Sequence, residues 1–132
     1  MRFEFKGYYF IVTSNKIVRK LGKLISLGDK AMAITVYPFI FVRNDTKGNA
    51  NLIRHEVIHI RQQLELLIIG ALLLSLIEYL YARYVKKLNA QQAYYYTALE
   101  QEAHINAKNK NYLLQRMPYE MFKYINDKKH IA

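Results

Sequence analysis

The chain has 132 residues, a formal net charge of +10 and no cysteine. This length supports one hydrophobic core, so a single domain over residues 1–132 is expected. Without cysteine there is no disulfide and no thiolate metal site, so any metal must be held by histidines and carboxylates. Basic residues are scattered from Arg2 to Lys129 with no run longer than two, and no specific nucleic-acid partner is predicted.

The N-terminal residues predict two strands and a helix. Phe3–Phe5 and Tyr9–Val12 are rich in aromatic and β-branched residues, which favour strands. Apolar residues at helical spacing predict a short amphipathic helix over Ser14–Ser26, followed by a turn at Leu27–Lys30. No convincing signal peptide is present, because the apolar stretch is too short, and a cytoplasmic location is expected.

A further strand is predicted over Ala31–Val42 by its composition. Pro38 has no N–H to donate, so this strand is expected to lie at a sheet edge or to break there. The polar segment Arg43–Asn51 then predicts a loop, in which Asn49 or Asn51 is expected to cap the next helix.

A long helix is predicted from Leu52 to Val85, and its segment Leu66–Ile77 is strongly apolar. This segment is shorter than the roughly 20 residues that a bilayer span requires. It is expected to pack in the core or against a second copy of the chain, or to lie at a membrane surface or insert shallowly into the membrane. Residues suited to anchoring it there are Tyr79, Tyr81, Arg83, Lys86 and Lys87.

Two more helices are predicted, a long one over Ala90–Asn109 and a short one over Pro118–Ile125. The expected fold is therefore α+β. A small N-terminal sheet with an edge strand precedes two long helices and a short C-terminal helix.

The most informative motif is H-E-x-x-H, formed by His55, Glu56 and His59. Residues i and i+4 of a helix share one face, so both imidazoles can bind one ion. Glu56 projects about 100° around from His55, where it can reach a water held by that ion. Two nitrogen ligands and a nearby carboxylate base are what zinc-assisted hydrolysis requires.

A third metal ligand is sought downstream, where Glu100, Glu102 and His104 are the candidates. On a helix Glu100 and Glu102 point about 160–200° apart, so only one of them can face the histidines. Helical geometry alone leaves the choice open.

The order of these motifs resembles the gluzincin branch of the zinc metallopeptidases, in which a later helix carries a ligating Glu in an E-A-x-x-D pattern. This chain has Glu102-Ala103-His104-Ile105-Asn106. The resemblance implies zinc on His55, His59 and Glu102, with Glu56 as the general base. It also implies that Asn106 replaces the family's Asp, which orients a ligating histidine.

The blocks at Arg54–Gln63 and Leu99–Asn106 are most similar to very small gluzincins, related to the minimal cores of CAAX-prenyl and heat-shock membrane peptidases. The resemblance implies a peptidase acting on peptide or protein substrates. It further implies that the edge strand at Thr35–Val42 binds extended peptide by strand addition. The alternative is a non-catalytic zinc-binding or membrane-associated helical protein with a structural or vestigial metal site.

Several polar residues near the motif have weaker expected roles. Gln62 and Gln63 lie near the metal face and are expected to be mainly structural. The tyrosines of the following helix are expected to pack, with Tyr95 the best placed to donate to an oxyanion. His104 is expected to be exposed if Glu102 ligates the metal, and His130 is expected to have no functional role.

Overall fold

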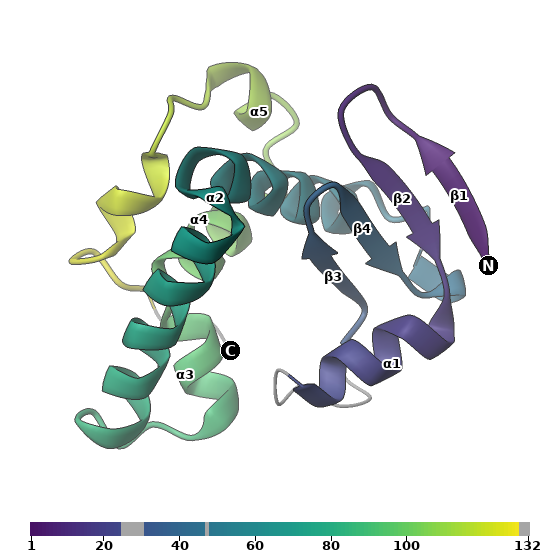
Figure 1. Cartoon of the computed structure of the whole chain (residues 1–132). Helices are drawn as coiled ribbons and strands as arrows, with labels where there is room; N and C mark the ends of the chain where they lie inside the picture. Colours follow the sequence, from purple (N-terminus) through teal and green to yellow (C-terminus); the bar gives the residue numbers. More distant parts are fainter. Residues whose placement is uncertain (25–30, 47, 130–132) are drawn as a thin grey trace.

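A small sheet forms the N-terminal part of the molecule, and helices form the rest (Figure 1). The computed structural model describes residues 1–24, 31–46 and 48–129. The predicted α+β class and the order of sheet, long helix and short C-terminal helices are confirmed. The turn predicted at Leu27–Lys30 and the residue His130 lie outside the described residues.

The sheet contains four strands in the order β1-β2-β4-β3. Strands β2 and β4 pair in parallel, and the other two pairs are antiparallel. The strand predicted as one segment is divided into β3 and β4 at Tyr37 and Pro38, as Pro38 suggested, and β3 is an edge strand. The strand bounds are β1 (Arg2–Phe5), β2 (Phe10–Thr13), β3 (Ala33–Val36) and β4 (Phe39–Val42).

A helix packs against part of each face of the sheet. The predicted amphipathic helix is confirmed as α1 (Asn15–Leu24), which packs Val18 against Ile34 of β3. On the other face Ile40 packs against Val57 and Ile60 of α2 (Ala50–Tyr84). The sheet core therefore holds the first half of α2, which carries the H-E-x-x-H motif, in a fixed position.

Helix α2 has the predicted length but is bent. Asn49 caps its start by accepting a hydrogen bond from the backbone N–H of Leu52 at 3.1 Å. At Leu67 the backbone is non-helical, with φ 60° and ψ 163°, a region that is strained for a leucine. The second half of α2 consequently runs in a different direction from the first (Figure 1).

The helix predicted over Ala90–Asn109 is wrong as a single element. It is divided into α3 (Ala90–Tyr96) and α4 (Ala98–Asn106), because Thr97 has an extended backbone with φ −62° and ψ 145°. Glu78 of α2 caps the new helix, since its Oε1 accepts a hydrogen bond from the backbone N–H of Ala98 at 2.8 Å. This hydrogen bond holds the N-terminus of α4 against α2.

The remaining described elements are short. The 3-10 helix η2 (Asn44–Thr46) precedes α2, and α5 (Tyr112–Gln115) follows α4. The helix predicted over Pro118–Ile125 appears as the 3-10 helix η3 (Glu120–Tyr124).

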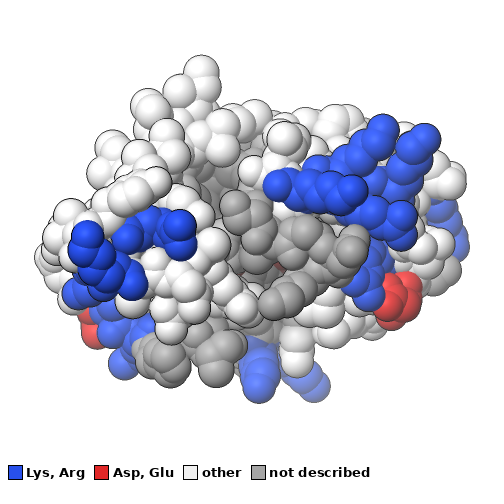
Figure 2. All heavy atoms as spheres, turned by 90° about the horizontal axis from the view of Figure 1, so that it is seen from below, with Lys and Arg blue, Asp and Glu red and all other residues white. Residues whose placement is uncertain are grey.

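Basic side chains gather at the end of the molecule that contains α1 and the C-terminal end of α2. Seen from below in Figure 2, Lys and Arg form groups on both sides of this face, and few acidic side chains are visible there. The exposed basic residues of α1 are Lys16, Arg19, Lys20 and Lys23, and those just after α2 are Lys86 and Lys87.

Candidate metal centre

His55, Glu56 and His59 lie together in the first half of α2, and all three side chains are buried. The two imidazole rings lie one turn apart along the helix and are oriented edge-on to each other, with their centroids 4.9 Å apart. Ligand atoms of the three residues lie within 4.8 Å of one another. The motif therefore has the shared face that the sequence predicts.

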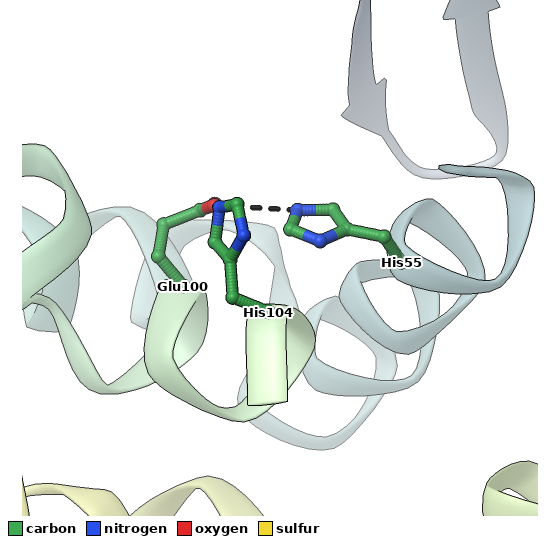
Figure 3. A group of neighbouring side chains, drawn as sticks. All are labelled: His55, Glu100 and His104. Carbon is green, nitrogen blue, oxygen red and sulfur yellow. Dashed lines mark ion pairs between the residues drawn. The ribbon is translucent and has the colours of Figure 1, made fainter. Parts of the chain in front are cut away.

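The residue that α4 brings to this face is Glu100. Its Oε1 lies 3.3 Å from Nε2 of His55, and its Oε2 lies 2.7 Å from Nε2 of His59. Figure 3 shows Glu100 and His55 approaching each other from the two helices. Glu56 completes the cluster, with its Oε2 3.7 Å from Nε2 of His55.

Glu102, the expected third ligand, does not reach the histidines. Its side chain is fully buried on the other side of α4, where Tyr112 and Gln62 donate hydrogen bonds to it at 2.7 and 3.0 Å. The guanidinium of Arg116 donates to the same carboxylate at 2.5 and 3.2 Å. A buried arginine requires a buried anion as its partner, and the carboxylate of Glu102 is such a partner for Arg116. The third candidate ligand is therefore corrected from Glu102 to Glu100.

Asn106 also has a different position from the expected one. Its side-chain amide donates hydrogen bonds to the backbone carbonyl of Glu102 at 2.8 Å and to the hydroxyl of Tyr124 at 3.0 Å. These bonds connect α4 to η3, and within the described part of the chain Asn106 makes no hydrogen bond to a histidine. The expected orienting role therefore falls to another residue.

Gln62 is the residue that orients a histidine. Its Oε1 lies 2.7 Å from Nδ1 of His59, and its amide nitrogen donates to Glu102 Oε1 and to the backbone carbonyl of Leu99, both at 3.0 Å. An amide oxygen only accepts hydrogen bonds, so Nδ1 of His59 carries the proton. Nε2 is thereby directed at Glu100, ready to bind a cation once it is deprotonated.

Glu100 and His59 form a buried ion pair. Burial alone would raise the pKa of Glu100, but the charge of His59 and contacts with His104 and His55 hold it well below its usual value. Burial lowers the pKa of His59, but the charge of Glu100 outweighs it and raises this pKa to about 10. In the cluster the negatively charged carboxylate of Glu100 therefore faces a protonated His59, and a metal cation can replace the proton of His59.

Two buried atoms of this pair have unsatisfied hydrogen-bonding capacity. Nε2 of His59 and Oε1 of Glu100 have no hydrogen-bond partner within the described chain, so the short contact between the two residues is an ion pair without good hydrogen-bond alignment. Ligand atoms around a tetrahedral zinc ion are roughly 3.4 Å apart for bonds of about 2.1 Å. The 3.3 Å and 2.7 Å separations approach that spacing, and the two-histidine, one-carboxylate donor set fits zinc.

His104 lies at the outer side of the cluster. Its Nε2 is 3.5 Å from Oε1 of Glu100, and its ring packs edge-on against that of His55 with the centroids 4.5 Å apart (Figure 3). On another side the ring packs edge-on against Tyr95, with the centroids 4.6 Å apart. Its side chain is 32% exposed, unlike the other histidines of the cluster. His55, Glu100 and His104 form one group of potential metal ligands, and it shares His55 with the group of His55, Glu56 and His59.

A cleft of about 380 Å³ opens beside the cluster, and Glu56, His59 and Glu100 line it. Most of its other lining residues are apolar and come from β3, α4 and the second half of α2, namely Ala33, Ile34, Val36, Ala71, Leu72, Leu76 and Leu99. The hydroxyl of Thr35 donates a hydrogen bond to Oε1 of Glu56 at 2.9 Å, which fixes the carboxylate at the cleft wall.

The edge of β3 is partly closed. The amide of Gln63 donates to the carbonyl of Thr35 at 2.9 Å and accepts from the backbone N–H of Tyr37 at 2.7 Å. These two backbone groups cannot pair with an added peptide while Gln63 holds them. The expected strand addition along Thr35–Val42 is therefore restricted at this position.

Among the tyrosines, Tyr94 rather than Tyr95 lines the cleft with Glu100. Burial, followed by the charges of Glu100 and Glu56, raises the pKa of Tyr94 well above its usual value. Its hydroxyl therefore stays protonated and can donate a hydrogen bond. The expectation that Tyr95 would be the best placed of these tyrosines does not agree with the lining of the cleft.

Comparison of the chain with protein-family models, with curated proteins and with solved structures gives no match.

Proposed function

We propose that this protein is a zinc-dependent metallopeptidase in which His55, His59 and Glu100 hold the ion and Glu56 is the general base. The observation that carries the proposal is the placement of the Glu100 carboxylate against Nε2 of both histidines, with Glu56 alongside. The resemblance of the H-E-x-x-H motif to gluzincins supports it. A bound zinc ion would act as a Lewis acid on the scissile carbonyl and on water.

The residues around the cluster have separate roles in this proposal. Glu56 removes a proton from the attacking water and delivers it to the leaving amine. Thr35 holds the Glu56 carboxylate by its 2.9 Å hydrogen bond. Tyr94 donates a hydrogen bond to the negative charge that develops on the carbonyl oxygen. Each role uses an atom that lines the same cleft.

The substrate in this proposal is a peptide or protein with an apolar side chain near the bond that is cut. The cleft lining is mainly apolar, and apolar surfaces select apolar groups. We place the enzyme in the cytoplasm, peripheral to a membrane or paired with a second copy through Leu66–Ile77. Helix α2 is long and apolar enough to cross a membrane by length and composition, which is weak evidence by itself.

The test combines metal analysis with peptide hydrolysis. Wild-type protein is expected to hold about one zinc ion per chain, whereas His59→Ala and Glu100→Gln are expected to lose it. Glu56→Gln is expected to keep zinc and lose hydrolysis, because only the base is removed. Zinc retained by Glu100→Gln, or peptide cleavage that survives in Glu56→Gln, contradicts the proposed roles.

The second candidate function is a non-catalytic zinc site. The observation that favours it is His104, whose Nε2 lies 3.5 Å from Oε1 of Glu100 and which joins His55 in a candidate ligand group. A fourth protein ligand would close the coordination shell, as in structural zinc sites. In that case His104→Ala weakens zinc binding as strongly as His55→Ala, and neither wild type nor Glu56→Gln cleaves any peptide in a degenerate library.

A further inference from the structure

The second half of α2 presents an apolar stripe to solvent. Its exposed residues recur at intervals of three and four and therefore share one helix face. They are Ile69, Leu72, Leu73, Leu76, Ile77, Leu80, Tyr81 and Tyr84, with exposed fractions between 43% and 72%. Contiguous exposed apolar surface of this kind marks an interaction site.

The opposite face of the same segment is covered by protein. Ala71 packs with Leu99 of α4 and Met121 of η3, and Ala82 is fully buried. Glu78 is also buried on this side, where it caps α4 and pairs with Lys128. A helix that is apolar on one side and bonded to its own protein on the other suits a surface-lying position better than a bilayer crossing.

Basic residues lie beyond the C-terminal end of the stripe and on α1. Lys86 and Lys87 are exposed just beyond α2, and α1 carries four exposed basic residues and no acidic one. Leu24, the last residue of α1, lines the cleft together with Leu72 and Leu76. Figure 2 shows basic side chains on both sides of this end of the molecule. An apolar stripe flanked by positive charge is complementary to an anionic lipid surface.

We propose that this face docks on an anionic bilayer and that the bilayer forms the missing wall of the cleft. The claim that the bilayer borders the cleft rests on Leu72 and Leu76, because these residues line the cleft and are also 65% and 52% exposed. Lipid in contact with the stripe therefore borders the cleft opening. The substrate is a peptide segment that lies in the interfacial layer of the bilayer, and this last statement rests on the proposed peptidase function.

Docking is tested with the full chain carrying Glu56→Gln, so that the result does not depend on hydrolysis. Co-sedimentation is measured with phosphatidylcholine vesicles, with and without phosphatidylglycerol. We expect binding to the anionic vesicles that falls as salt is raised. The double variant Leu73→Glu/Ile77→Glu is expected to lose binding. The matched control is Leu114→Glu/Met117→Glu, which makes the same charge change at apolar residues that are 87% and 64% exposed.

The contribution of positive charge to vesicle binding is tested with two double variants. Lys86→Glu/Lys87→Glu is expected to weaken binding to anionic vesicles by roughly twentyfold or more. Lys108→Glu/Lys110→Glu makes the same change in net charge at exposed positions after α4 and is expected to have a smaller effect. Equal effects of the two pairs would show that net charge alone drives binding and would overturn the docking face.

Two further outcomes also decide the proposal. Equal sedimentation with neutral and anionic vesicles, or none with either, overturns it. If Leu73→Glu/Ile77→Glu instead converts a dimer to a monomer in light scattering, and vesicle binding is absent in both proteins, the stripe is an interface with a second copy. Because docking is read with an inactive variant, a failed peptidase assay leaves the docking result intact.

Discussion

Nδ1 of His59 lies 2.7 Å from Oε1 of Gln62, whose amide nitrogen in turn donates to Glu102 at 3.0 Å. Through this chain of contacts Glu102 is connected to His59 without touching it. Arg116 anchors the far end, because it binds Glu102 and forms a two-point contact with Glu65 at 2.6 and 2.9 Å. The buried charges therefore hold His59 in one orientation.

Replacing Gln62 with leucine is expected to weaken zinc binding by about 10- to 100-fold, the usual effect of removing an orienting partner of a ligating histidine. The imidazole would keep its position on α2 but lose the acceptor that fixes its Nδ1 proton. Competition with a chromophoric chelator measures the affinity. Gln115→Leu, at an exposed glutamine of α5, is the control, and equal affinities of the two variants would refute the orienting role.

Glu100→Gln and Glu102→Gln are expected to have opposite consequences. The first removes a ligand, so zinc is lost while the metal-free fold is retained. The second leaves the ligands in place but takes the charge partner from the buried Arg116. Breaking such a pair typically costs about 3–5 kcal/mol of unfolding free energy, and the remaining contact with Glu65 places the expected loss at the lower end. Denaturant unfolding and metal analysis of both variants measure the contrast.

The choice between these two glutamates shows where sequence reasoning stops. The strands, α1 and the start of α2 follow from local patterns: β-branched residues, helical spacing and the Asn49 cap. Both glutamates, however, occupy the same helix, and their roles are decided by Arg116, a partner fourteen or more residues away. No local pattern identifies that partner, so resemblance to a family motif favoured Glu102.

The sequence also predicts neither of the two breaks in the helices. Thr97 lies inside a segment predicted to be one helix, but its backbone is extended. The break leaves the backbone N–H of Ala98 without a helical partner, and Glu78 accepts a hydrogen bond from it. Leu67 lies inside an apolar run in which the nearest glycine is Gly70. At Thr97 a tertiary contact overrides local helix propensity, and Thr97 also lines the cleft.

Zinc binding is expected to release protons and to strengthen as pH rises above neutrality. The pKa of His59 is raised from 6.5 to about 10 by Glu100, so its Nε2 is protonated at pH 7 in the metal-free protein. Zinc must displace that proton. Calorimetry at pH 7 in buffers of different ionisation enthalpy is expected to show about one proton released. No dependence of the heat on the buffer would contradict this protonation state.

The same pair determines how the stability of the metal-free protein varies with pH. The lowered pKa of Glu100 gives stability above its unfolded value of 4.5, which is lost as pH falls further. The raised pKa of His59 gives stability below its unfolded value of 6.5, which is lost as pH rises toward 10. The contribution of the pair is therefore largest between these values. Unfolding of wild type and Glu100→Gln across pH is expected to differ most there.

Leu67→Gly is expected to stabilise the protein by about 1 kcal/mol, because glycine adopts a positive φ without the strain that leucine experiences. The leucine side chain is 72% exposed, so little packing is lost. Leu76→Gly, in the regular part of the same helix, is the control and is expected to destabilise by about 1 kcal/mol. Thermal unfolding of the two variants in the absence of lipid measures the difference in sign.

Glu78→Leu is expected to weaken zinc binding although Glu78 lies outside the ligand cluster. Its Oε1 accepts the hydrogen bond from the backbone N–H of Ala98 at 2.8 Å, which sets the first turn of α4 and hence the position of Glu100. Loss of a helix cap typically costs about 1 kcal/mol, and a displaced Glu100 fits the ion less well. Glu78→Gln keeps the acceptor oxygen and is expected to restore zinc affinity while still losing the charge pair with Lys128. If the glutamine variant binds zinc as weakly as the leucine variant, the charge at this position matters and the cap does not.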